Sequence, residues 1–175
     1  MSARCRPKMK CLAMLWAAAL ALDRPLAAQE PKAQVPVTFA FEEIVTLTPM
    51  EVIGTTPIGV RQRIPITGGT FSGPGIQGKV LPGGADWQLR RADGSLVIDA
   101  DYMIKTDDGV QIHVHNVGVV NPGKDGAPSY KWAAPVFEVP MGKYGWLNDA
   151  IFVSTLGPAG DKDHPAVKIT IYKIG

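Results

Sequence analysis

Apolar and polar residues alternate with a period of two along most of this chain, and no window shows a sustained helical period of 3.6 residues. The clearest alternation lies in residues 86–90, 96–105 and 110–115. Asp93-Gly94 joins the first two runs and Asp108-Gly109 joins the last two. Since Asp-Gly is a strong hairpin signal, the three runs predict an antiparallel meander.

The same periodicity predicts further strands elsewhere in the chain. They are expected at residues 37–47, 60–66, 78–81, 136–139, 150–156 and 167–174. The total is about nine strands, with turn signals roughly every 8–12 residues. An antiparallel set of this kind leaves no exposed edges when it closes on itself. The sequence therefore predicts an all-β fold, an antiparallel β-barrel, with a two-sheet β-sandwich as the alternative.

The first 28 residues have the order of a secretory signal peptide. Basic residues between positions 4 and 10 precede the apolar run 11–22, and Leu26-Ala27-Ala28 supplies small residues at a processing point. The apolar run is short for a transmembrane helix, although a retained anchor is the alternative. We therefore expect a signal peptide at 1–28, a tether at 29–36 and one barrel domain at 37–175. The expected location is the periplasm or the extracellular medium.

Removing that segment changes the charge of the protein. It holds five of the 18 basic and one of the 16 acidic residues, which leaves 13 basic and 15 acidic residues, a net charge of −2. Nucleic-acid binding requires a basic surface, so we expect no nucleic-acid partner, and no membrane partner after cleavage. Both cysteines, Cys5 and Cys11, lie in the same segment, so the exported domain would have no disulfide and no thiolate chemistry.

Asp86 is the first candidate for chemistry. It follows a Pro-Gly-Gly-Ala turn and precedes Trp87, so its carboxylate could lie beside apolar surface at the barrel wall. Burial there would raise its pKa, as a general acid or base near neutral pH requires. The alternative is an aspartate that accepts backbone N–H bonds within its own turn. If His115 faces the lumen, it could share a proton with Asp86 as the second catalytic residue.

His113 and His115 share one strand face, and a pair of this spacing can present two imidazoles to one metal. A stable site needs a third ligand, for which the sequence offers His164 or a distant carboxylate such as Asp86 or Glu138. We therefore predict no metal site and place His113 among the candidate ligand-binding residues.

Several aromatic residues could line a pocket for a flat, apolar ligand. Trp87, Tyr102 and Trp146 are the candidates, and Asn148 is included beside Trp146. Each aromatic side chain could equally belong to the barrel core. Arg63, expected near the barrel entrance, could hold a ligand carboxylate.

Four motifs resemble a known family. They are residues 66–74 (ITGGTFSGP), 81–88 (LPGGADWQ), 106–109 (TDDG) and 144–148 (YGWLN), in that order along the chain. They resemble the domain-of-unknown-function 3237 family, also called uncharacterised protein family 0311, and the resemblance covers about residues 37–174. It implies a compact, lipocalin-like β-barrel that often assembles into homo-oligomers, and it implies little about activity.

Two functions therefore remain open. The first is an exported barrel that binds a small, largely apolar or aromatic molecule. The second is an isomerase, cyclase or lyase that uses Asp86 as general acid or base. No serine lies in a G-x-S-x-G motif, so a serine triad has no support and any catalysis is expected to need no cofactor.

Overall fold

The computed structural model describes residues 34–124 and 127–175. The expected signal peptide at 1–28, and the tether as far as residue 33, lie outside the described residues. Within the described ranges, no helix is long and apolar enough to cross a membrane. The helical element found there is the 3-10 helix η1 (Gly145–Leu147).

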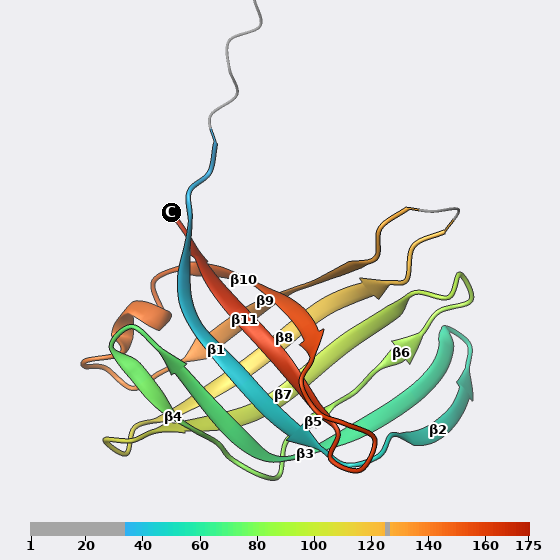
Figure 1. The fold of residues 1–175 in the computed structure, drawn as a ribbon, viewed down its shortest axis with the longest axis horizontal. Coiled ribbons are helices and arrows are strands. Elements are labelled where there is room, and N and C mark those ends of the chain that lie inside the picture. The colour runs from blue at the N-terminus through green and yellow to red at the C-terminus, as the bar shows by residue number, and fades with distance from the viewer. Residues whose placement is uncertain (1–33, 125–126) are drawn as a thin grey trace, which may run out of the picture. The chain divides into compact units, whose positions relative to one another are not determined.

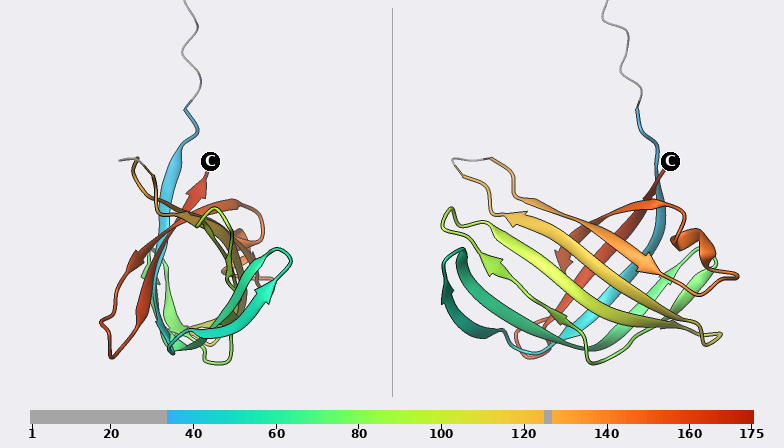
Figure 2. Two further views of the ribbon diagram at one scale, coloured as in Figure 1. Left: turned by 90° about the vertical axis from the view of Figure 1, so that its right-hand side faces the viewer. Right: turned by 180° about the vertical axis from the view of Figure 1, so that it is seen from behind.

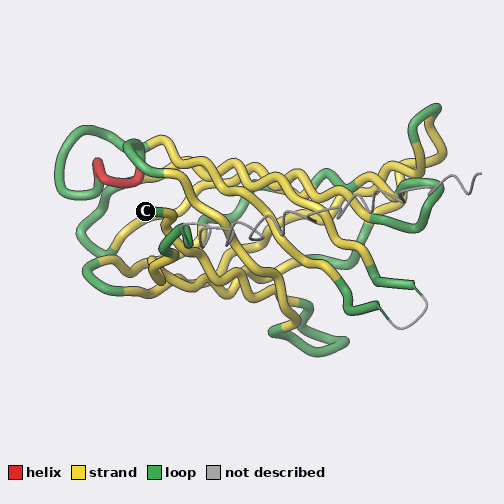
Figure 3. The backbone as a smooth tube through the Cα atoms, turned by 90° about the horizontal axis from the view of Figure 1, so that it is seen from above, coloured by secondary structure: helices red, strands yellow, loops and turns green. Residues whose placement is uncertain are grey.

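The described part of the chain contains eleven strands (Figures 1 and 3). They are β1 (Val37–Leu47), β2 (Glu51–Thr56), β3 (Gly59–Gly73), β4 (Ile76–Val80), β5 (Ala85–Asp86), β6 (Leu89–Arg90), β7 (Leu96–Thr106), β8 (Gln111–Asn121), β9 (Tyr130–Glu138), β10 (Ile151–Pro158) and β11 (Ala166–Ile174).

Every strand pair is antiparallel, and the sheet closes because β1 pairs with both β11 and β3. Starting from β1, the order continues through β11, β10, β9, β8 and β7. The short strands β4, β5 and β6 then fill the single position between β7 and β3. The left view of Figure 2 shows the strands curving round in a ring. The predicted antiparallel barrel is confirmed, and closure excludes the two-sheet sandwich.

The predicted meander is also confirmed, since β6, β7 and β8 pair in sequence. Gly94 and Gly109 adopt φ values of 87° and 94° in the two turns, a conformation that glycine tolerates best. The strand β2 was not predicted, and β3, β8 and β9 are longer than predicted. In β3 the extension crosses Thr67-Gly68-Gly69-Thr70, where the sequence offers no apolar alternation.

Aromatic side chains fill one end of the barrel, the end that carries η1 and the β3–β4 and β7–β8 turns (left in Figure 1). Phe41 lies at the centre, with its ring 5.7 Å from both Phe71 and Phe137. Phe152 continues the cluster at 5.1 Å from Phe137, and Trp146 lies 5.8 Å beyond it. Because these rings occupy the interior, this half of the barrel is a packed core, and the space for a ligand lies in the other half.

Candidate functional site

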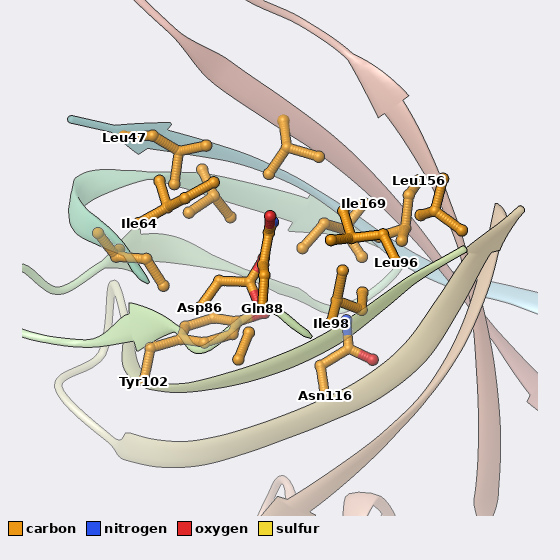
Figure 4. Close-up of a pocket in the computed structure, with 15 residues that line it drawn as sticks. Leu47, Ile64, Asp86, Gln88, Leu96, Ile98, Tyr102, Asn116, Leu156 and Ile169 are labelled. Carbon is orange, nitrogen blue, oxygen red and sulfur yellow. The ribbon is translucent and has the colours of Figure 1, made fainter. Parts of the chain in front are cut away.

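A cavity of about 160 Å³ lies inside the barrel, between the aromatic cluster and the opposite end. A cavity of about 150 Å³ is large enough to bind benzene in another protein. Most of the lining side chains are aliphatic and come from β1, β3, β7, β8, β10 and β11 (Figure 4). These are Val45, Leu47, Ile64, Ile66, Leu96, Ile98, Ala100, Val120, Leu156, Val167 and Ile169.

Four polar side chains complete the lining: Asp86, Gln88, Tyr102 and Asn116. Asp86 lies on the short strand β5 and Gln88 between β5 and β6, whereas Tyr102 and Asn116 lie on the long strands β7 and β8. The aliphatic side chains form the rest of the cavity wall, and the aromatic cluster fills the barrel on one side of the cavity. An apolar pocket with a few convergent polar groups is the arrangement typical of small-molecule sites.

Asp86 lies on the two-residue strand β5, wedged between β3 and β7. Its Oδ2 accepts a 2.6 Å hydrogen bond from the Gln88 amide, and its Oδ1 accepts a 3.0 Å bond from the backbone N–H of Asp99. Both donors lie outside the Pro-Gly-Gly-Ala turn, so Asp86 does not serve as a cap for its own turn. Burial raises the pKa of Asp86, the two hydrogen bonds oppose that rise, and the nearby charge of Asp99 adds to it.

The turn before Asp86 packs closely against the neighbouring strand β7. Gly84 lies so close to the backbone of Asp101 and Tyr102 that a Cβ at this position would collide with them. The absence of a side chain therefore lets β5 approach β7 and aims Asp86 into the interior.

A second carboxyl group lies deeper in the barrel. Glu43 on β1 is fully buried, and the Tyr102 hydroxyl donates a 2.5 Å hydrogen bond to its Oε2. Burial raises the pKa of Glu43 from 4.5 to about 7, while the hydrogen bond from Tyr102 opposes the rise. Burial and the neighbouring Glu43 hold the pKa of Tyr102 well above its usual value, and Asp86 acts in the same direction.

Three buried side-chain oxygens in the described part of the chain have no hydrogen-bond partner. They are Glu43 Oε1, Asn116 Oδ1 and Ser154 Oγ. A buried polar atom without a partner costs about 1–3 kcal/mol, so each of these oxygens requires an explanation such as a bound water molecule, an ion or a ligand. Asn116 lies in the cavity wall, where a bound molecule could use its amide.

We expect the buried carboxyl of Glu43 to make the protein less stable at alkaline pH. Between pH 4.5 and about 7 the folded state holds a proton that the unfolded state has released, so the free energy of unfolding falls as pH rises through this window. The contribution is fully present below the lower value and is lost above the higher one. From the size of the shift, the loss is roughly 3 kcal/mol between pH 5 and pH 8.

Urea unfolding of the wild type and of Glu43→Gln at pH 5 and pH 8 checks this expectation. Glu43→Gln should remove most of the difference between the two pH values, leaving the smaller part that Asp86 contributes in the same direction. An equal loss of stability in the variant would show that other groups cause it.

The structure places the two histidines on the outside of the barrel. Inward positions of β8 alternate with outward ones, and His113 and His115 occupy outward positions. The ring of His115 lies 2.8 Å from Asp99 Oδ1, and that of His113 lies 3.1 Å from Asp101 and 3.4 Å from Glu138. The suggested proton sharing between His115 and Asp86 is therefore not formed, since the barrel wall separates them. No cluster of metal-ligating groups occurs in residues 34–124 and 127–175.

Of the other predicted ligand-binding residues, only Tyr102 lines the cavity. Trp87 is 44% exposed on the outer surface, where the guanidinium of Arg63 lies 5.5 Å from its ring and also pairs with Glu51. These two residues border an open groove on the outside of the barrel, which Tyr102 also lines and which differs from the interior cavity.

Trp146 and Asn148 lie at the aromatic end of the barrel. Trp146 packs against the core, and Asn148 exchanges two 2.9 Å hydrogen bonds with the backbone of Val139. Asn148 therefore fixes the segment after β9, and neither residue is among those that line the cavity.

Sequence reasoning missed four polar residues of the interior: Glu43, Gln62, Gln88 and Asn116. Gln62 donates to Gln88 at 3.4 Å, and Gln88 in turn donates to Asp86. A signal was available, because Glu43 interrupts the inward series Phe41, Val45 in β1. A polar residue at an inward position of an apolar alternation is the feature that marks such a site.

The chain matches known proteins over nearly all of the barrel domain. The family described as "Protein of unknown function (DUF3237)" matches residues 35–174. A UPF0311 protein of Clostridium acetobutylicum is 36% identical over 130 residues, which cover 65% of this chain and 82% of that protein.

Two further similarities concern structure and activity. A solved β-barrel like protein of Acinetobacter baumannii has a TM-score of 0.72 and 30% identity, covering 84% of this chain and 100% of that one. A hydroalkoxylation enzyme of Penicillium herquei is 30% identical over 111 residues, covering 63% of this chain and 67% of that protein. The closed barrel and the family match together show that this chain belongs to the DUF3237 family, the proteins also named UPF0311.

Proposed function

We propose that the barrel cavity binds a small, largely apolar molecule and that Asp86 transfers a proton to or from it, without a cofactor. The observation that carries the proposal is a carboxyl group of raised pKa in the wall of a mostly aliphatic cavity. A binding protein gains little from such a group, because burying it reduces stability. A general acid needs it, because a carboxyl with a raised pKa keeps its proton closer to neutral pH.

The contacts of Asp86 support a catalytic position. The Gln88 amide and the backbone N–H of Asp99 each donate a hydrogen bond to one carboxyl oxygen of Asp86, and the Gln62 amide donates a hydrogen bond to Gln88. A carboxyl group fixed in this way is oriented before the substrate binds, which lowers the barrier to proton transfer. The aliphatic walls exclude water and select an apolar molecule of about the size of one aromatic ring.

The relative from Penicillium herquei suggests a reaction class. Hydroalkoxylation adds an O–H group across a carbon–carbon double bond, so one proton reaches carbon and one leaves oxygen. When both groups belong to one molecule, the reaction is an isomerisation that closes a ring. We propose a reaction of this kind, in which protonated Asp86 delivers the proton to carbon and the substrate carries a weakly acidic hydroxyl and an alkene.

Binding of 2-allylphenol tests the position of the site. This probe has one ring, one hydroxyl and one alkene, and it matches the cavity in size and chemistry. We expect saturable binding by isothermal titration calorimetry. Ala100→Leu should weaken this binding by at least about tenfold, because a larger side chain at Ala100 fills the cavity.

The matched control is Ala134→Leu, which makes the same change at an exposed position of β9 outside the cavity. It should bind the probe like the wild type. If Ala100→Leu misfolds, Leu96→Trp narrows the same cavity from a less buried position. Equal binding by the folded cavity variants and the control would place the probe elsewhere and refute the proposed site.

A further inference from the structure

A second proton-transferring group lies beside Asp86. The ring of Tyr102 lines the cavity, and its hydroxyl donates to Glu43 at 2.5 Å. Figure 4 shows the Tyr102 ring extending toward the Asp86 and Gln88 side chains. Tyr102 thus connects the cavity with a carboxyl group that does not line it.

Glu43 has no other partner among the described residues. Its Oε1 is buried without a hydrogen bond, and neither a basic side chain nor a backbone N–H donates to the carboxylate. A carboxyl group buried in this way reduces the stability of the fold. A glutamine could accept the same hydrogen bond from Tyr102 without that cost, so hydrogen bonding alone does not account for an acid here.

We infer that Tyr102 is a second catalytic residue of this site and that Glu43 is its positioning residue, which takes up the proton that Tyr102 passes on. The inference rests on the proposed function and adds to it the group that receives the proton of the substrate hydroxyl. It also defines the substrate class further, as a molecule whose weakly acidic O–H faces Tyr102.

The proton balance is closed within the site. In the reactive protonation state the two carboxyl groups share one proton, which lies on Asp86 and leaves Glu43 as a carboxylate. The substrate hydroxyl gives its proton to the Tyr102 oxygen as the Tyr102 proton moves to Glu43 Oε2, so Glu43 becomes a carboxylic acid. Protonated Asp86 gives its proton to the substrate carbon and becomes a carboxylate. After the product leaves, a water molecule that enters the vacated cavity carries one proton from Glu43, through Tyr102, to Asp86. No oxidant, reductant or cofactor is consumed.

Two probes that differ only in the O–H group test the inference. 4-Nitrophenol carries the acidic hydroxyl and changes colour when it ionises, whereas 4-nitroanisole carries a methyl ether in its place. We expect the wild type to bind 4-nitrophenol about fivefold more tightly than 4-nitroanisole, the effect of one additional hydrogen bond to the Tyr102 oxygen. Tyr102→Phe should bring this ratio close to one while leaving 4-nitroanisole binding within about threefold of the wild type.

The role of Glu43 is read from the ionisation of bound 4-nitrophenol between pH 5 and pH 9. If ionisation of the bound 4-nitrophenol is coupled through Tyr102 to that of Glu43, a plot of absorbance against pH for the wild type shows more than one titration step. Glu43→Gln should lose the step that Glu43 contributes. This variant keeps the shape of the side chain, so it tests the inference even if Tyr102→Phe does not fold.

The outcomes separate the two proposals. The inference is overturned if Tyr102→Phe binds both probes with the same affinity ratio as the wild type, or if Glu43→Gln has the ionisation curve of the wild type. Either result would leave the proposed roles of Asp86 and the cavity unaffected. Failure of the wild type to bind either probe would instead refute the proposed cavity function, and this inference with it.

Discussion

Replacing Asp86 by asparagine is expected to lower the rate at which the protein cyclises 2-allylphenol by about 10²–10⁴-fold, the usual contribution of a general acid or base. Asparagine can keep hydrogen bonds with Gln88 and with the backbone of Asp99, but it has no proton to deliver. The measurement is the initial rate of cyclic-ether formation, followed by chromatography and mass spectrometry at equal concentrations of folded protein.

Asp101→Asn is the matched control for this experiment. Asp101 lies on the neighbouring strand β7 and faces outward, where its carboxylate contacts His113. The same substitution there should leave the rate within about threefold of the wild type, because it changes a contact on the outer surface and leaves the cavity unaltered. Equal rates for the wild type and both variants would exclude Asp86 as the proton donor.

Phe41→Ala is expected to destabilise the fold by about 3–5 kcal/mol, the usual cost of removing a buried aromatic side chain. Phe41 is fully buried and contacts the rings of Phe71 and Phe137, so its loss leaves a void at the centre of the aromatic cluster. The midpoint of urea unfolding measures the change in the free energy of unfolding.

Phe39→Ala is the control for the aromatic core. Phe39 is 43% exposed and packs edge-on against Tyr172 at 6.3 Å, on the outside of the same strand. Its removal should cost about 1 kcal/mol or less, since surface substitutions have small effects. Similar losses in the two variants would contradict a barrel whose stability depends on the aromatic end.

The fold could be predicted from the sequence because alternation and turns carry most of its information. The Asp-Gly turns and the alternating runs on either side of them specify β6, β7 and β8 without any long-range knowledge. Closure of the sheet could be expected from the number of strands, but no local pattern specifies which strands pair to close it. The closing pairs, β1 with β3 and β1 with β11, join residues that are far apart in the chain. The strand β2 pairs only with β3 and has mostly exposed side chains, so no apolar pattern marks it.

The site could be predicted only in part. Asp86 was identified because an aspartate between a glycine turn and a tryptophan suggests a carboxylate near apolar surface. The sequence suggested that Trp87 could line a pocket, but the structure has Asp86 and Gln88 inside and Trp87 outside. Alternation of polar and apolar residues shows that a strand has two faces. In strands as short as β5 and β6, however, it does not show which face points into the barrel.

Glu43 illustrates a different limit. The residues around it in the sequence show no clear alternation of polar and apolar side chains. Its burial follows only from its position in β1, which points into the barrel. Its hydrogen bond to Tyr102 connects residues 59 positions apart, a distance that no local pattern spans. The histidines gave the opposite error, because a chemically reactive pair occupies an outward face and contacts surface carboxylates.

The most direct test of the account is a carboxyl ¹³C NMR titration of protein labelled at aspartate, with and without 2-allylphenol. We predict that the Asp86 resonance titrates above the ordinary value of 3.8, and that its chemical shift changes when the probe binds. The same titration of Asp86→Asn assigns the resonance. An Asp86 that titrates at or below its ordinary pKa, with a chemical shift that the probe leaves unchanged, would contradict a partly buried acid at the wall of a binding cavity.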